Sequence, residues 1–337
     1  MLLMFKFFSL GESLKEASTF TLYANQEILL LVSCYQYQSS LSVWNFREET
    51  HRSQLDSLHK IQGRVDKCAL SDHDCTLALY SKDCYVSIHH IGVDGSITDL
   101  HKIPECQTVS FLEVSNFGFL YIGHMKELIA INLDNYERNK IHTEDRIIAM
   151  YEIDMKTTSV VITCHSGHNI RIWRKNLGMI AVVDLLGDGD TSTDAQTCIY
   201  SIHYVTNKDE LVIGHNGNIT VYRVKNRKFV YIKKQAHRDN ITCISVYQSE
   251  NSSYLLTMCC YCIKMWRYGD KDLELIKGDI HIANSSIYQL VAVPDVGLFL
   301  TGMYNYEAGL VLWRDTNVYL SKRLKESQNF EGLPIST

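Results

Sequence analysis

A short motif recurs along this chain at an almost constant interval. The segments IRIWR, IKMWR and LVLWR each end an apolar run in tryptophan followed by arginine, and they hold three of the four tryptophans. The fourth lies in SLSVWNF, and related runs occur in YVSIHHI, ELIAINL and NITVYRV. The bulky residues of these runs are Trp44, His89, Ile131, Trp173, Tyr222, Trp266 and Trp313, at separations of 45, 42, 42, 49, 44 and 47 residues. Self-similarity at such a period predicts a repeat architecture.

Each repeat contains several runs in which apolar and polar residues alternate, the pattern typical of β-strands. One repeat reads ITCISVYQ, YLLTMCCY, CIKMWRY and LELIKGDI. Four antiparallel strands cannot bury both faces alone, but radial stacking of neighbouring repeats covers them. The sequence therefore predicts an all-β fold, a seven-bladed β-propeller with four antiparallel strands per blade in a single domain. The bulky third-strand residues are expected to pack between blades and to be structural; they are Trp44, Trp173, Tyr222, Trp266 and Trp313.

An apolar triplet ending in tryptophan, with an upstream histidine such as His237 in AHRDNITCISV, resembles the WD-repeat β-propeller family over roughly residues 18–320. The aspartate that follows the tryptophan in that family is replaced here, by Asn45, Arg174, Arg267 and Arg314. Asp83 matches the family's tight-turn aspartate, and Asn169 and Asn216 match it approximately. The resemblance implies a divergent propeller, held more by packing than by polar side-chain networks.

The two ends of the chain offer one strand too many for a closed ring. Residues 18–320 are expected to form the propeller, residues 1–17 to carry a strand that could close the last blade, and residues 321–337 to form a tail. FKFFSL near the start and VYLSKRL near the end compete for the outer position of that blade.

Composition narrows the possible partners. The net charge of −5 gives no basic field for nucleic acid. The most basic segment, Arg223–Lys234, interleaves its charges with strand-forming residues and fits a solvated strand edge better than an RNA or phosphoinositide site. No stretch reaches 18 apolar residues, and the eleven cysteines are scattered singly. These features favour a soluble cytoplasmic or nuclear protein with reduced thiols.

No catalytic or cofactor motif is present. The chain has no G-x-S-x-G, H-E-x-x-H or P-loop motif and no pair of C-x-x-C knuckles. Cys259 and Cys262 are three residues apart, would point to opposite faces of one strand, and have no further zinc ligand indicated nearby. We therefore predict no metal and no cofactor.

Two other patterns imitate metal sites. Cys164, His165 and His168 lie around a predicted hairpin turn, where their polar groups more simply satisfy the local backbone. The segment DGDTSTD offers alternating oxygens, like the start of an EF-hand loop. That loop then has Thr193 and Ile199 where glycine and a bidentate glutamate are required.

Turns between second and third strands share one face of a propeller with the connections that lead to the next blade. We expect a partner-binding surface on this face, in blades three to six, that prefers a basic peptide. Its candidate residues are His124, His165, His168, His215, Asp188, Asp190, Asp194, His237, Arg238 and Asp239. The alternative for the histidines is that they only bond to the neighbouring backbone.

The function expected from these observations is a non-catalytic scaffold or adaptor for protein or peptide partners, monomeric by itself within a larger complex. Resembling family members serve in membrane coats, nuclear pores, ubiquitin ligases, signalling and RNA processing. One alternative is a propeller hydrolase whose central-channel site combines His203 with Asp72, His73 and Asp74. The other is an RNA or phosphoinositide binder that uses the Arg223–Lys234 edge.

Overall fold

In the computed structural model of this chain, only part of the sequence is described. The described residues are 8–9, 17–24, 28–35, 39–47, 52–61, 65–71, 75–81, 83–92, 96–104, 109–115, 117–155, 158–166, 169–175, 177–184, 199–205, 207–226, 228–249, 252–281, 286–293, 298–304 and 310–314. Side-chain environments are described mainly between residues 65 and 281.

The described strands form four-stranded sheets in which neighbouring strands are antiparallel. In chain order the sheets contain β2 (Ala17–Ala24), β3 (Ile28–Tyr35), β4 (Ser39–Arg47) and β5 (Arg52–Ile61); β6 (Val65–Leu70), β7 (Thr76–Ser81), β8 (Tyr85–Ile91) and β9 (Ile97–Ile103); β10 (Phe111–Val114), β11 (Phe119–His124), β12 (Glu127–Asn132) and β13 (Arg138–His142); β14 (Ile147–Met155), β15 (Thr158–His165), β16 (Asn169–Arg174) and β17 (Met179–Asp184); β18 (Ile199–Val205), β19 (Glu210–His215), β20 (Asn218–Arg223) and β21 (Lys228–Lys233); β22 (Cys243–Ser249), β23 (Ser252–Met258), β24 (Cys262–Tyr268) and β25 (Leu273–His281); and β26 (Ser286–Val293), β27 (Leu298–Tyr304), β28 (Leu310–Arg314) and β1 (Phe8–Ser9).

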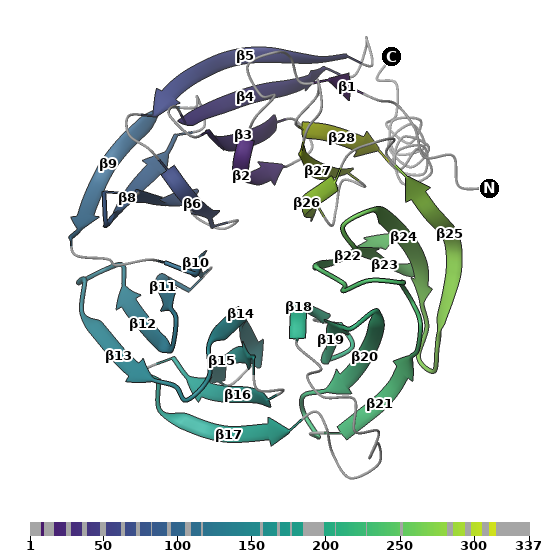
Figure 1. The fold of residues 1–337 in the computed structure, drawn as a ribbon. Helices are drawn as coiled ribbons and strands as arrows, with labels where there is room; N and C mark the ends of the chain where they lie inside the picture. The colour runs from purple at the N-terminus through teal and green to yellow at the C-terminus, as the bar shows by residue number, and fades with distance from the viewer. Residues whose placement is uncertain are drawn as a thin grey trace, which may run out of the picture.

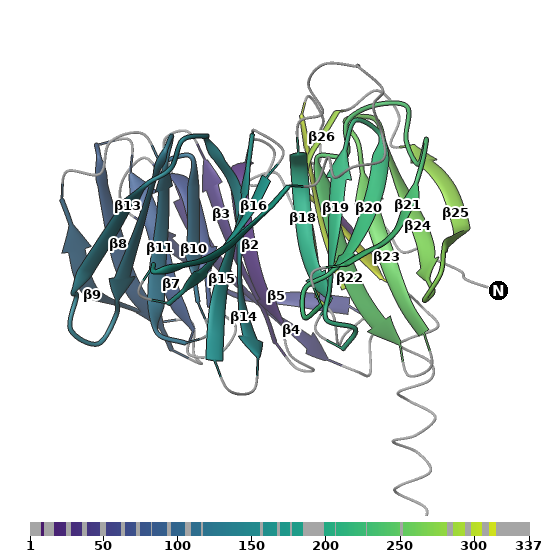
Figure 2. The same cartoon turned by 90° about the horizontal axis from the view of Figure 1, so that it is seen from below.

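The sheets are arranged as blades around a central axis (Figure 1). The first strand of each sheet, such as β2 or β6, lies nearest the axis, and the fourth lies on the outside. First strands of neighbouring blades contact one another, and β2 also contacts β26, so the first and last sheets meet. Seen from the side, the blades form a layer about one strand length thick (Figure 2).

The N-terminal strand completes the last blade. β1 pairs with β28 in an antiparallel manner, with Phe8 opposite Leu312 and Ser9 opposite Val311. Of the two competing terminal segments, FKFFSL therefore supplies the outer strand, whereas VYLSKRL lies outside the described residues. Hydrogen bonds thus connect residues from opposite ends of the sequence.

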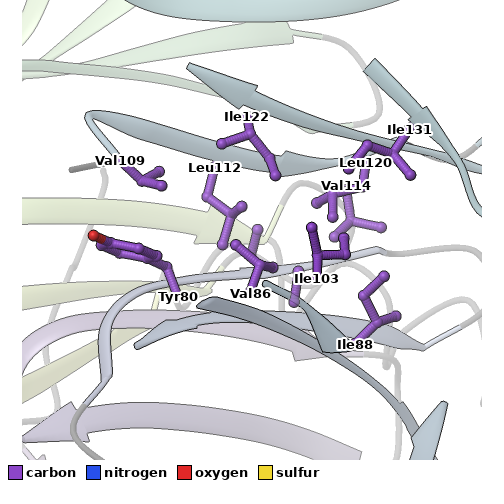
Figure 3. Close-up of a cluster of buried hydrophobic side chains, with 12 residues drawn as sticks. Tyr80, Val86, Ile88, Ile103, Val109, Leu112, Val114, Leu120, Ile122 and Ile131 are labelled. Carbon is purple, nitrogen blue, oxygen red and sulfur yellow. The ribbon is translucent and has the colours of Figure 1, made fainter. Parts of the chain in front are cut away.

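The apolar core lies between blades as well as within them. In the cluster of Figure 3, Tyr80, Val86, Ile88 and Ile103 come from the blade of β6–β9. Facing them are residues of the next blade, namely Val109, Leu112, Val114, Leu120, Ile122 and Ile131. Close-packed apolar side chains in this layer hold the two blades together.

The bulky third-strand residues contribute to the same layers. Trp173, Tyr222 and Trp266 are all buried. Trp173 packs with Tyr121 of the preceding blade, and Trp266 packs with residues of β19 and β20. A register shift toward the fourth strand occurs at each of these three residues, as a β-bulge that inserts one residue would produce. Trp44 and Trp313 lie at the matching positions of β4 and β28.

Within the part of the chain that the structure describes, there is no helix of the length and apolar character needed to cross a membrane.

Candidate functional site

The turns between second and third strands and the connections into the next blade form one face, here called the loop face. Its described parts include the turns after β11, β19 and β23, Ser166 after β15, and residues 143–146 and 234–242. Backbone hydrogen bonds tie turns to connections: Ile147 N–H donates to Met125 O at 3.1 Å, and His237 N–H donates to Gly217 O at 2.9 Å. The loop face is therefore supported by the blades beneath it.

One of these contacts requires glycine. Gly217 has a φ of +74°, and a Cβ placed on it would lie 2.5 Å from the carbonyl oxygen of His237. Only glycine adopts such a conformation without strain and also allows so close an approach. The turn after β19 can therefore contact the connection to β22.

His124 belongs to a charged cluster on this face. Glu127 lies 2.8 Å from Lys140 Nζ, 3.3 Å from His142 Nε2 and 3.8 Å from His124 Nδ1. The hydrogen bond from Lys140 lowers the pKa of Glu127 below its ordinary value, so the carboxylate is charged at neutral pH. The cluster joins the end of β11 to β12 and β13.

A pocket of about 310 Å³ opens beside this cluster. Its apolar lining includes Ile103, Ile122 and Ile131, which belong to the inter-blade core of Figure 3. Its polar lining consists of His124, Glu127, Arg138 and Lys140. An apolar floor with a few convergent polar groups is the usual composition of a binding pocket.

His165 is inside the protein and not on its surface. It is fully buried, its Nε2 lies 2.8 Å from the hydroxyl of Thr163, and its Nδ1 lies 3.3 Å from Asp145 O. The indole N–H of Trp173 donates to the same hydroxyl at 2.8 Å. Burial lowers the pKa of His165 to about 4, so this histidine is neutral at physiological pH. The expectation that His165 contributes to a partner-binding surface is corrected: it forms part of a buried histidine–threonine–tryptophan network.

His237 forms an equivalent network in the blade of β22–β25. Its Nε2 lies 2.7 Å from Thr257 Oγ1, which accepts a 2.8 Å hydrogen bond from Trp266 Nε1. His237 is also buried, so it is not available to a partner. These two networks show that the blades retain more polar organisation than the replaced aspartates suggested.

The other side of His237 faces two thiols. Its Nδ1 lies 3.5 Å from Cys262 Sγ, which lies 3.5 Å from Cys259 Sγ. The expectation that these cysteines point to opposite faces is wrong, because they do not lie on one strand. Cys259 N–H donates to Cys262 O across the β23–β24 turn, which places the two side chains on the same face. Despite burial, the hydrogen bond with Cys262 and a weaker one with His237 lower the pKa of Cys259.

The remaining candidates are only partly brought together. His215 is half-buried and lies 2.7 Å from Thr220 Oγ1. Arg238 and Asp239 are exposed on the loop face. The other candidates lie outside the described residues: His168, Asp188, Asp190 and Asp194. Cys164 is completely buried and its pKa is raised by burial, whereas a metal-binding thiol must lose its proton.

Two alternative sites can be compared with the structure. His203 on β18 has its pKa lowered to about 4 by burial, while Asp72, His73 and Asp74 lie outside the described residues. In the basic segment, Arg223 pairs with Glu210, and Lys233 lies 3.2 Å from Asp272. These acidic partners reduce the positive field that a phosphate group would meet.

Sequence reasoning missed Glu127, Arg138 and Lys140 because strand alternation alone does not show which charges meet across β12 and β13. It also missed Thr163 and Thr257. A signal for these was present, since threonine precedes tryptophan by ten residues in one repeat and by nine in the other. His237, which meets Cys259 and Cys262, lies more than twenty residues before them in the sequence. Local spacing could not assign it to the two thiols.

Radially packed four-stranded sheets, bulky third-strand residues and histidine–threonine–tryptophan networks define a divergent WD-repeat β-propeller. More specifically, the chain belongs to the family described as "Nucleolar protein 10-like, N-terminal domain", whose model matches residues 36–309. The fold is similar to that of Sqt1 from Saccharomyces cerevisiae, with a TM-score of 0.60 and 16% identity over 85% of this chain and 81% of Sqt1. At this identity the likeness shows the fold alone. No curated protein matches the chain.

Proposed function

We propose that this chain is a seven-bladed, non-catalytic platform that binds protein partners on its loop face. The propeller spans residues 18–320, with residues 1–17 supplying the closing strand and residues 321–337 forming a tail. A ring whose turns are hydrogen-bonded to the connections between blades offers a surface that loses little conformational entropy when a partner binds. That property suits a scaffold subunit.

The family description supports a nucleolar location. Its printed name refers to a nucleolar protein, and this narrows the cytoplasmic or nuclear expectation from composition. We therefore place the partners of this chain in a nucleolar protein assembly.

The pocket between the blades of β6–β9 and β10–β13 carries the proposal. Its floor is apolar, and its rim holds Arg138 and Lys140 against the single carboxylate Glu127. This composition fits an apolar side chain of a partner whose neighbouring residue is acidic. The preference for a basic peptide rested on the acidic candidates Asp188, Asp190 and Asp194, which lie outside the described residues.

Site-specific photocrosslinking in cells tests the proposal. A photoreactive amino acid replaces Met125, which is 59% exposed in the turn next to the pocket, and a matched probe replaces Leu275, which is 47% exposed on the outer strand β25. We expect a discrete crosslinked partner from position 125, absent from position 275 and strongly reduced by Arg138→Glu. Equal crosslinking from both positions, or no effect of Arg138→Glu, would contradict the proposed surface.

Microscopy of the same tagged chain tests the location. We expect co-localisation with a nucleolar marker. A uniform cytoplasmic distribution would contradict the nucleolar location that the family name suggests.

A further inference from the structure

The turn between β23 and β24 brings three metal-binding side chains to one point. Cys259 and Cys262 are the first and last residues of this turn, and their Sγ atoms are 3.5 Å apart. His237 reaches the same point from the connection before β22, with Nδ1 at 3.5 Å from Cys262 Sγ. One ligand atom from each of the three residues lies within 4.8 Å of the other two.

The imidazole of His237 is held in the orientation that a metal ligand requires. Its Nε2 contacts Thr257 Oγ1, and its backbone N–H donates to Gly217 O. With a metal on Nδ1, Nε2 would carry the hydrogen and donate it to Thr257. A hydroxyl has two acceptor positions, so Thr257 could accept this bond together with the one from Trp266. Such an outer hydrogen bond is the usual support of a metal-bound histidine.

The separations agree with tetrahedral coordination. Bond lengths of about 2.3 Å to sulfur and about 2.1 Å to nitrogen place neighbouring ligand atoms about 3.6 to 3.8 Å apart around a tetrahedral zinc ion. The two measured separations of 3.5 Å need only small adjustments. Two thiolates and one imidazole also form a ligand set that binds zinc in preference to magnesium or calcium.

The chain contains its own comparison for the histidine network. His165 and His237 each contact a threonine that accepts a hydrogen bond from the tryptophan of the same blade. At His165, Nδ1 faces the backbone carbonyl of Asp145, whereas at His237 it faces two thiols. The network therefore does not itself require cysteines, and the thiol pair at His237 calls for a separate role.

We propose that His237, Cys259 and Cys262 form a zinc site that fastens the β23–β24 turn to the connection between two blades. Binding releases the protons of both thiols, and the metal takes Nδ1 of the neutral imidazole. A water molecule completes the coordination. The site is independent of the proposed partner pocket, which lies on other blades.

The site has a different consequence from a disulfide. A Cys259–Cys262 disulfide would join two residues of one turn. It would leave His237 unconnected to that turn, because no thiolate would remain to bind a metal together with Nδ1. A metal uses all three groups and links the turn to a segment more than twenty residues upstream. Only metal binding therefore links the turn through coordination bonds to the connection that carries His237.

The test uses the full chain, purified with a non-coordinating reductant and stripped by a chelator. Zinc is added, and its affinity and stoichiometry are measured by competition with a chromophoric chelator. Cobalt(II) added to a second sample reports ligand type, because thiolate ligation gives a charge-transfer band in the near ultraviolet and tetrahedral geometry gives intense visible bands. Thermal unfolding with and without zinc reports the coupling to stability.

The variants are Cys259→Ser and Cys262→Ser, with Cys260→Ser as the matched control. Cys260 lies in the same turn but is exposed and is not part of the cluster. We expect one zinc per chain and a thiolate–cobalt band in the wild type and in Cys260→Ser, and at least a tenfold loss of zinc affinity in the other two. Zinc should also raise the unfolding temperature of the wild type.

Three results would overturn the proposal. The first is unchanged zinc affinity in Cys259→Ser and Cys262→Ser. The second is a fully reduced wild type that binds no zinc. The third is a Cys260→Ser protein in which the peptide that carries Cys259 and Cys262 loses two hydrogen masses on mild oxidation while no thiolate–cobalt band appears, which would assign the pair to a disulfide. Circular dichroism of each variant establishes that the fold is intact, and the partner crosslink from position 125 is measured separately.

Discussion

The hydroxyl of Thr257 accepts a 2.8 Å hydrogen bond from the indole N–H of Trp266 and lies 2.7 Å from Nε2 of His237. All three side chains are buried. Thr257 therefore connects the blade centre to the loop face, and Thr163 does the same between Trp173 and His165.

Replacing Thr257 by valine should destabilise the protein although valine has nearly the same shape. The indole N–H and the histidine would both lose their partner inside the protein, and each buried unsatisfied group costs about 1–3 kcal/mol. We expect urea denaturation to show a loss of roughly 2–4 kcal/mol in the free energy of unfolding. Thr98→Val is the control, because Thr98 is exposed on β9 and its replacement should change stability by about 0.5 kcal/mol at most.

Alanine substitutions at three glycines distinguish the steric cost of an added Cβ atom from the conformational cost of a positive φ. Gly217→Ala should be the most destabilising, by about 2–4 kcal/mol, because it combines a positive φ with a clash against His237 O. Gly118 has a φ of +77° but nothing within 4 Å of its Cβ position, so Gly118→Ala should cost only about 1 kcal/mol. Gly278→Ala would meet only the end of Leu275 at 3.5 Å and should be tolerated. Thermal unfolding of the three variants should follow this order, and an equal loss in all three would contradict the argument.

His165 makes stability depend on pH. Its folded pKa of about 4 lies below its ordinary value of 6.5, so between these pH values the unfolded chain binds a proton that the folded chain does not. Stability should therefore fall as the pH decreases through this range, by up to about 1.4 kcal/mol per pH unit for this group. The His165→Asn variant should show a shallower slope of unfolding free energy between pH 6.5 and pH 4.

A constant offset between His165→Asn and the wild type would reflect only the lost hydrogen bonds, and parallel slopes would contradict the assignment of a depressed pKa. Thr98→Val provides the comparison, since Thr98 is exposed on β9 and carries no titratable group, so its variant should keep the wild-type slope.

Glu210 should contribute more to stability than an exposed carboxylate with a similar partner. It is 1% exposed, pairs with Arg223 on its own blade and accepts a hydrogen bond from the Tyr268 hydroxyl of the next blade. Glu210→Gln removes the charge from both bonds and should cost about 1.5–3 kcal/mol.

The control is Glu274→Gln, which removes the exposed pair between Glu274 and Arg267 and should cost less than about 1 kcal/mol. Chemical denaturation measures both variants. A larger effect at Glu274 would contradict the conclusion that the buried Glu210 contributes more to stability than an exposed carboxylate.

The repeat interval was enough to predict four-stranded blades and the inter-blade positions of Trp173, Tyr222 and Trp266, because strand alternation and a bulky residue are local in sequence. The burial of His165 and His237 was not predictable in the same way. It depends on a threonine from one strand and on a connection that folds over the turn. The meeting of His237 with Cys259 and Cys262 depends on the geometry of a four-residue turn, and a strand register predicted without that turn placed the two thiols on opposite faces.

Closure of the ring by β1 imposes an order on the contacts that form during folding. Phe8 and Ser9 are synthesised roughly 300 residues before their partners Leu312 and Val311. At about 5–20 residues per second this interval lasts on the order of 15–60 s. For that time the first strand has no native neighbour, while the blades behind it can already stack. Strand β1 therefore makes one of the last contacts of folding, although it is synthesised before the strand with which it pairs.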